Sequence, residues 1–165
     1  YNNMATANQN LSEHDVSKVP SAEGMHISIV VAEWNEQITS NLLKGAKKTL
    51  LNYGLKEENL VIKFVPGSFE LPLSAQFLLE KTQTDAVICL GSVIQGETKH
   101  FDFVCEGVSQ GIKDVSLKYN KPVIFGVLTD NTLQQSIDRS GGKYGNKGDE
   151  AAITAIKMIH LWNSI

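Results

Sequence analysis

The sequence predicts an α/β fold in which one four-stranded parallel sheet lies between two layers of helices. Four short apolar runs, rich in β-branched residues, alternate with segments whose apolar residues recur at helical spacing. Each run is almost continuously apolar, as expected for parallel strands that are buried on both faces. Right-handed crossovers then give a flavodoxin-like three-layer αβα sandwich.

The elements follow one another in a regular order. Residues 1–24 are polar, with Met4 a candidate start, and we expect an N-terminal arm that is ordered only where another surface holds it. Residues 25–165 are expected to form a single domain. The strands are expected at residues 26–32, 60–65, 86–90 and 123–128.

Segments in which apolar residues recur at helical spacing separate these strands, and two more helices are expected after the fourth strand. A short helix is expected over 133–139 and a final helix over 149–162, with a glycine-rich elbow between them. The stripes that indicate the earlier helices are Ile38, Leu42, Ala46 and Leu50; Phe69, Leu73 and Phe77; and Val104, Val108, Ile112 and Val115.

Composition excludes several classes of function. The chain is 42% hydrophobic with a net charge of −3 and has no basic stripe, so nucleic-acid binding is not expected. Cys89 and Cys105 fall in apolar contexts, which favours free thiols in a reducing cytoplasm. The four histidines are scattered, so no metal site is expected. No apolar run is long enough for a membrane span, and no signal peptide is evident.

The loop after the third strand, residues 91–104, carries the strongest functional pattern. It supplies Gly96 for close backbone approach, Thr98 as a helix-capping hydroxyl and His100 as a proton carrier near neutral pH. Because ligands of open α/β sheets bind beyond the carboxyl ends of the strands, an anion site beside His100 is expected. The alternative is an ordinary polar histidine in the first turn of a helix.

Two earlier loops leave their interpretation open. Trp34, at the end of the first strand, either stacks on a planar ligand or covers an edge of the core. Gly67 either adopts a positive φ or permits a close ligand approach, and Ser68 is otherwise a simple N-cap.

The glycine-rich elbow carries cations. Four glycines between residues 138 and 148 are flanked by Arg139, Lys143 and Lys147, and arginine is suited to bidentate phosphate binding. Neither a Walker A loop nor a dinucleotide-binding glycine pattern is present. Taken alone, the elbow also fits a solvated turn with surface cations.

Taken together, these loops closely resemble the lumazine synthase family. The match runs in order through Trp34-Asn35, the segment 65–72, the loop 91–104, Phe125-Gly126 and the segment 139–148. Gln95 and Lys99 depart from the residues that many members carry. The resemblance implies condensation of 5-amino-6-(D-ribitylamino)uracil with 3,4-dihydroxy-2-butanone 4-phosphate, which yields 6,7-dimethyl-8-ribityllumazine, phosphate and water. It implies no cofactor and no metal.

The resemblance also implies a role for each site residue. His100 is the proton carrier, Arg139 clamps the phosphate, and Trp34 stacks on the pyrimidine. The phosphate loop is Gly96, Glu97 and Thr98. The other residues expected to bind the ribitylaminouracil are Asn35, Ser68, Phe69, Glu70, Ser92, Val93, Ile94, Phe125 and Lys147.

Assembly is a further implication of the resemblance. Phe125, Arg139 and Lys147 are expected to reach the site of a neighbouring subunit in a homopentamer. The short elbow favours twelve pentamers closed into a hollow shell, and an association with riboflavin synthase is expected as well.

Two other functions are alternatives to the enzyme. They are a flavin or pterin carrier on the same fold and a purely structural shell protein. A receiver domain fails because Gly91-Ser92 stands where its aspartate would be.

Overall fold

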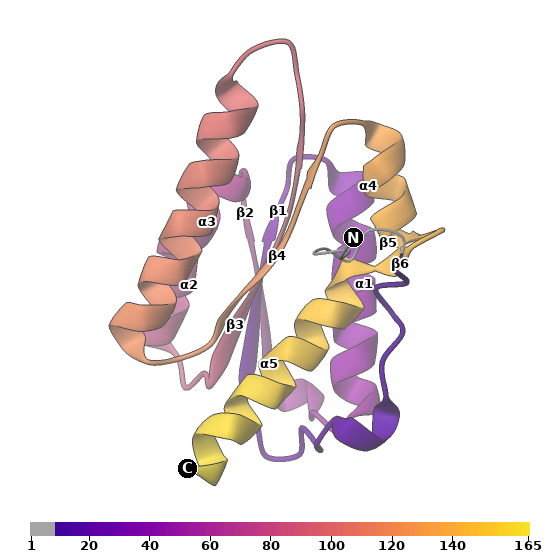
Figure 1. Cartoon of the computed structure of the whole chain (residues 1–165). Helices are drawn as coiled ribbons and strands as arrows, with labels where there is room; N and C mark the ends of the chain where they lie inside the picture. Colours follow the sequence, from indigo (N-terminus) through magenta and orange to yellow (C-terminus); the bar gives the residue numbers. More distant parts are fainter. Residues whose placement is uncertain (1–8) are drawn as a thin grey trace.

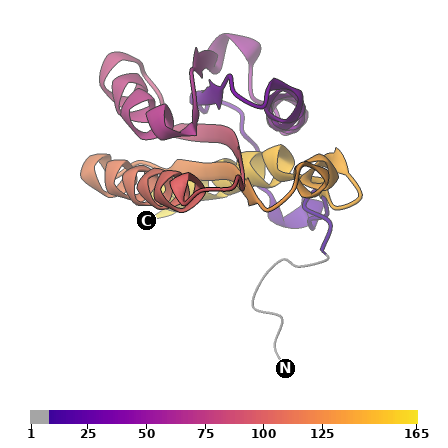
Figure 2. The ribbon, with the colours of Figure 1, turned by 90° about the horizontal axis from the view of Figure 1, so that it is seen from above.

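The computed structural model describes residues 9–165. Its main sheet consists of β1 (Ile27–Ala32), β2 (Leu60–Val65), β3 (Ala86–Ile94) and β4 (Val123–Asp130), all parallel in the order β2-β1-β3-β4. Helices α2 (Leu71–Lys81) and α3 (His100–Tyr119) cover one face, and α1 (Glu36–Asn52) and α5 (Lys147–Ser164) cover the other (Figures 1 and 2). The predicted three-layer sandwich is confirmed.

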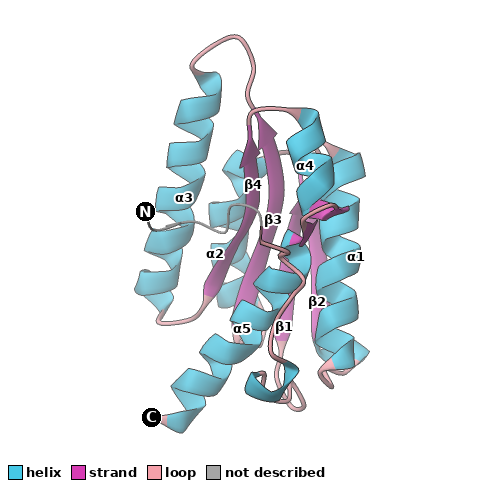
Figure 3. Cartoon of the chain, turned by 45° about the vertical axis from the view of Figure 1, so that its right-hand side comes forward, coloured by secondary structure: helices cyan, strands magenta, loops and turns pink. Residues whose placement is uncertain are grey.

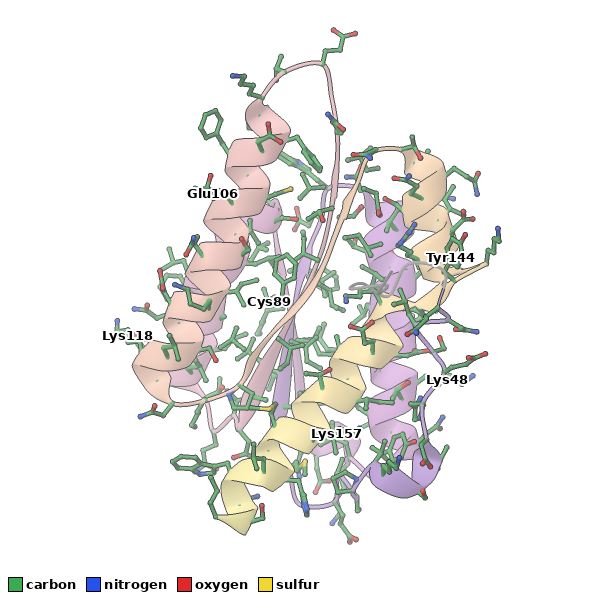
Figure 4. All side chains as sticks on the ribbon, viewed as in Figure 1. Lys48, Cys89, Glu106, Lys118, Tyr144 and Lys157 are labelled. Carbon is green, nitrogen blue, oxygen red and sulfur yellow. The ribbon has the colours of Figure 1, made fainter. Side chains whose placement is uncertain are left out.

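Each face of the sheet has its own apolar core. Along β3, Ile88 and Leu90 pack against α1 and α5, whereas Val87 and Cys89 pack against α2 and α3. Figure 4 shows Cys89 in the interior, between the helix layers. The predicted stripe on α1 is buried. On α3, Val108, Ile112 and Val115 are buried, and Val104, the first residue of the predicted stripe, is half-buried.

The apolar stripe predicted for α2 faces solvent and not the sheet. Phe69, Leu73 and Phe77 are each more than half exposed, and the buried positions are Leu71, Ala75 and Leu78. A 3-10 turn over Ser68–Glu70 precedes the helix, which therefore begins at Leu71. Because both faces of α2 carry apolar residues, spacing alone could not tell which face meets the sheet.

The third strand is longer than predicted. β3 continues past Leu90 to Ile94 because β4 extends alongside it, as far as the pair Ile94 and Asp130. Gly91 to Ile94 are therefore part of the sheet and not of the loop, and the loop proper begins at Gln95. The last residues of β3 thus project beyond β1, which ends at Ala32.

The glycine-rich elbow is a small hairpin. After α4 (Leu133–Arg139), β5 (Ser140–Gly142) and β6 (Gly145–Asn146) pair antiparallel, and α5 follows directly (Figure 3). The final helix therefore starts at Lys147, two residues before the predicted position. The side chain of Asn146 caps it by accepting a hydrogen bond from the amide of Gly148 at 2.8 Å.

The described part of the N-terminal arm, residues 9–24, packs against its own chain. It contains the 3-10 turn Val16–Lys18, and another such turn, Glu57–Asn59, precedes β2. Val19 and Ala22 are buried in the α1–α5 core, and His14 hydrogen-bonds to the hydroxyl of Tyr53 at 2.6 Å. Met4 and the rest of residues 1–8 lie outside the described residues. Within residues 9–165, no helix is both long and apolar enough to cross a bilayer.

Candidate active site

A pocket of about 530 Å³ lies beyond the carboxyl ends of β1, β2 and β3. This is the edge at which open α/β sheets bind their ligands. Nine of the residues proposed from the sequence line it, and they come from the loops after β1 and β2, the end of β3 and the start of α3. These residues are Trp34, Asn35, Ser68, Phe69, Glu70, Ser92, Val93, Ile94 and His100.

The loops after β1 and β2 are tied together by their backbones. The amide of Glu33 donates to the carbonyl of Val65 at 2.8 Å, and that of Trp34 donates to Pro66 at 3.1 Å. Gly67 is extended, with φ −143°, so a positive φ does not explain the glycine. A Cβ on Gly67 would lie 3.1 Å from Cε3 of Trp34. Glycine therefore allows the indole to approach the backbone this closely without a shift of either group.

Trp34 presents its ring to the pocket. The residue is 68% exposed, so it does not serve as a cover for the core. An exposed indole at the end of a strand offers a flat apolar surface on which a planar ring can stack.

Asn35 joins the first loop to β3. It adopts a left-handed conformation, with φ 59° and ψ 46°, which asparagine tolerates better than most residues. Its side-chain amide donates to the carbonyl of Ser92 at 2.8 Å. This hydrogen bond holds the loop that carries Trp34 against the strand that forms the floor of the pocket.

The segment from Ser68 to Glu70 forms another wall. Ser68 is buried beside Gly91, and it is not the N-cap of the turn, because Gly67 occupies that position. The Glu70 carboxylate accepts a hydrogen bond from the amide of Gly67 at 3.0 Å. This bond orients the carboxylate, and an oriented acceptor can bind a hydroxyl-rich chain.

His100 is the first residue of α3, and its side chain is exposed on the pocket wall. Its backbone amide donates to Oγ1 of Thr98 at 3.3 Å, so Thr98 caps this helix from one position before the N-cap, Lys99. Phe103 and Val104 also line the pocket and were not proposed from the sequence. Their positions, three and four residues after His100 on a helix, were the available signal.

The segment proposed for phosphate lies next to this pocket but does not line it. Gly96, Glu97 and Thr98 are exposed between β3 and α3. A Cβ on Gly96 would meet no atom within 4 Å, so packing within the chain does not require a glycine there. The first amides of a helix have no partner within the helix and can bind an anion in this open space.

The remaining proposed residues lie away from the pocket. Arg139 stacks over Tyr144 at 5.1 Å and donates to the carbonyl of Gln135 at 3.2 Å. Lys147 pairs with Glu150 at 2.6 Å. Phe125, on the edge strand β4, lines a separate groove between β4 and α3. The single chain thus brings nine proposed residues together and leaves these three on other surfaces.

Neither cysteine lines the pocket. Cys89 is buried and Cys105 is half-buried, and burial raises the pKa of both thiols. Across residues 9–165, no group of three or more His, Cys, Asp or Glu side chains has an arrangement that could hold a metal ion.

Fold and pocket together define a class of protein: an α/β enzyme that binds a small substrate beyond the ends of its parallel strands. Comparison with known proteins narrows this class. The family model described as 6,7-dimethyl-8-ribityllumazine synthase matches residues 24–163. The chain therefore belongs to the 6,7-dimethyl-8-ribityllumazine synthase family, a family of transferases in riboflavin biosynthesis.

Individual relatives carry the same name. The protein from Parabacteroides distasonis is 60% identical over 96% of this chain and 99% of its own length. The Cytophaga hutchinsonii protein is 56% identical over 94% of this chain and 98% of its own length. That from Flavobacterium johnsoniae is 56% identical over 96% of this chain and 83% of its own length. The resemblance noted from the sequence is thus confirmed at the level of the family.

Proposed function

We propose that this protein condenses 5-amino-6-(D-ribitylamino)uracil with 3,4-dihydroxy-2-butanone 4-phosphate to 6,7-dimethyl-8-ribityllumazine, with release of phosphate and water. The observation that carries the proposal is the pocket of about 530 Å³ that collects Trp34, Glu70 and His100 in a member of this family. Both the amine nucleophile and the phosphate leaving group belong to the substrates. The protein therefore has to hold two reactants and move protons, and it needs no nucleophilic side chain.

The uracil ring stacks on Trp34, whose indole is exposed in the pocket. Backbone groups of Ser92, Val93 and Ile94 at the end of β3 bind the edge of the ring. The ribityl chain lies toward Ser68, Phe69 and Glu70, where the oriented carboxylate accepts hydrogen bonds from its hydroxyls. Asn35 supports this arrangement through its hydrogen bond to Ser92.

The phosphate binds at the open N-terminus of α3, over Gly96, Glu97 and Thr98. The open space above Gly96 and the partial positive charge of a helix N-terminus both favour an anion there. Gln95 is neutral, so the second substrate needs a cation from elsewhere, and Arg139 supplies it.

His100 transfers protons during the reaction. Imine formation, phosphate elimination and ring closure each move a proton near neutral pH, which suits an imidazole. Its place at the first turn of α3 puts it between the phosphate segment and the pocket that Trp34 and Glu70 line.

The complete site requires a neighbouring subunit. Phe125, Arg139 and Lys147 do not line the pocket of their own chain, and we propose that they complete the pocket of the next protomer in a homopentamer. The short elbow favours closure of twelve pentamers into a hollow shell, with which riboflavin synthase associates. We place the reaction in the cytoplasm, where free thiols such as Cys89 and Cys105 stay reduced.

The test is to mix purified protein with the two substrates in the presence of a chelator. We expect lumazine absorbance to rise in step with free phosphate. Binding of the product without phosphate release would indicate a flavin or pterin carrier. Activity lost in the chelator and restored by a divalent ion would contradict the proposed metal-free reaction.

A further inference from the structure

The first described residues of the chain lie against the hairpin that connects the two proposed cationic site residues. Arg139 directly precedes β5, and Lys147 directly follows β6. We call the segment Asn10–Ser12 the strap. In Figure 1, the indigo trace starts beside the β5–β6 hairpin and then continues beside α1.

The strap is held by backbone and side-chain contacts to the hairpin. The amide of Leu11 donates to the carbonyl of Tyr144 at 2.7 Å, and the amide of Asn146 donates to Oγ of Ser12 at 2.9 Å. A Cβ on Gly145 would lie 2.7 Å from the amide nitrogen of Ser12. Gly145 also has a φ of +78°. Both its conformation and its lack of a side chain are therefore needed for the strap to lie this close.

Ser12 makes the central link. While its Oγ accepts from Asn146, its hydroxyl donates to Oδ2 of Asp149 at 2.6 Å. The other carboxylate oxygen of Asp149 accepts from Thr49 on α1 at 3.3 Å. One hydroxyl thus connects the residue just before Lys147 with a residue in the first turn of α5.

The same hairpin holds Arg139. Its guanidinium lies 5.1 Å from the centre of the Tyr144 ring, and the amide of Tyr144 donates to the carbonyl of Asp138 at 2.7 Å. Tyr144, labelled on the hairpin in Figure 4, is therefore bonded to the strap through its carbonyl and to the end of α4 through its amide. A shift of Tyr144 with the strap would change one contact of Arg139, whose guanidinium also donates to the carbonyl of Gln135 at 3.2 Å and lies 4.0 Å from the carboxylate of Asp130.

We propose that the strap is a positioning device for the proposed active site and that Ser12 is its central positioning residue. Ser12 touches neither proposed substrate. It fixes the spacing between Arg139 and Lys147, which together have to meet a phosphate and a pyrimidine. The proposal rests on the proposed function, because it assigns those two cations to substrate binding.

The test compares Ser12→Ala with Ser12→Thr, which keeps the hydroxyl. The matched control is Ser17→Ala, outside the strap in the 3-10 turn Val16–Lys18, which removes a hydroxyl that bonds only to Asp15 among the described residues. Ser12→Ala removes both hydrogen bonds of the hydroxyl, and the loss of a single hydrogen bond already changes an equilibrium constant by about 3- to 10-fold. We therefore expect Ser12→Ala to raise KM for both substrates by about 3-fold or more, with kcat nearly unchanged. Ser12→Thr should restore KM, and Ser17→Ala should match the unmodified protein.

Two outcomes would overturn the proposal. One is an unchanged KM in Ser12→Ala. The other is a loss of kcat and melting temperature that Ser12→Thr does not restore, since that result indicates only a general role in stability.

Hydrogen exchange separates this proposal from the proposed function. In Ser12→Ala, the peptide that covers Tyr144 to Asp149 should exchange several-fold faster, because the amide of Asn146 loses its acceptor. If the unmodified protein forms no lumazine, the proposed function fails, and exchange still reports on the strap. Unchanged exchange would show that the strap does not hold the hairpin.

Discussion

Asn35 combines an unusual backbone conformation with a contact inside the pocket. Among the described residues, only Asn35 and Asn120 have a positive φ without being glycine. Asn120 is the C-cap of α3 and lies near the amino ends of the strands, away from the pocket. Both residues therefore have a left-handed backbone, but only Asn35 lines the pocket. Variants at the two positions therefore distinguish the free-energy cost of a left-handed backbone from the role of the Asn35 side chain in substrate binding.

We expect Asn35→Ala and Asn120→Ala each to lower the free energy of unfolding by about 1–2 kcal/mol, because alanine adopts the left-handed region at that cost. Glycine at either position should recover most of this loss. Only the Asn35 variants, Asn35→Gly included, should raise KM for the uracil substrate, because only they lose the hydrogen bond to Ser92. Thermal unfolding and steady-state kinetics measure the two effects. Equal KM values in all four variants would contradict a role for Asn35 in the site.

The proposed roles of His100 and Arg139 predict unequal losses. His100→Ala should lower kcat by about 10²-fold or less, because water can partly replace a proton carrier. Arg139→Ala should cost more in kcat/KM, because it removes a charge-assisted contact to phosphate. Lys143→Ala, on the same hairpin, is the control for a general loss of positive charge. An inactive His100 variant beside a nearly normal Arg139 variant would reverse the assignment.

Among the elements, α3 shapes the pocket by means of two small residues. A Cβ on Gly107 would lie 2.8 Å from the ring of Phe69, and one on Gly111 would lie 2.7 Å from Pro72. The start of α2 can therefore approach α3 closely, and Phe69 is held at the wall of the pocket. The packing of two helices thus determines the position of a proposed binding residue.

Gly107→Ala should displace the Phe69 ring and raise KM for the uracil substrate several-fold, with a smaller change in kcat. Glu106→Ala is the control, because it changes the neighbouring exposed position of the same helix (Figure 4). Inhibition constants of product analogues with different ring sizes then measure the change in the pocket. Unchanged kinetics in Gly107→Ala would show that Phe69 can move without consequence for the substrate.

Strand β3 carries a thiol that should remain protonated in the folded chain. Burial raises the pKa of Cys89 above its ordinary value. Above about pH 8.5, the unfolded chain therefore loses a proton that the folded chain keeps, and the free energy of unfolding falls as the pH rises. We expect the melting temperature to fall less steeply between about pH 8 and about pH 10 in Cys89→Ala than in the unmodified protein.

Cys105→Ala provides the comparison for this pH effect, since Cys105 is only half-buried. Thiol reagents should also modify Cys89 only after denaturation. Rapid labelling of Cys89 in the folded protein would show that the centre of the sheet opens readily.

At the scale of the whole molecule, the proposed site residues lie in both helix layers. His100 and Phe69 lie with α2 and α3, whereas Arg139 and Lys147 lie with α4 and α5 (Figures 1 and 2). Within one chain, the first two residues line the pocket and the other two do not. Large apolar side chains, among them Trp34, Phe64, Phe69, Leu73, Phe77 and Phe103, are also exposed on the chain. Both features favour an assembly in which neighbouring subunits complete each site.

From the resemblance to the family we expect particles built from pentamers, and the short elbow favours twelve pentamers closed into a hollow shell. Light scattering and negative-stain microscopy at neutral pH measure the particle mass and shape. A particle of pentamer mass would contradict the shell and leave the shared site intact. An active monomer would contradict both.

The sequence alone determined the order of strands and helices, the parallel sheet and the position of His100 at the start of α3, because apolar spacing is a local property of the chain. It also indicated most of the pocket, since residues that follow parallel strands meet at one edge of the sheet. The three-dimensional structure showed which face of α2 is buried and that Gly67 lies close to the indole of Trp34. It also decided that Phe103 and Val104 line the pocket and that Ser12 bridges Asn146 and Asp149. Each of these features depends on contacts between segments that are distant in the chain or on the direction in which a helix turns its side chains, and local spacing does not specify either.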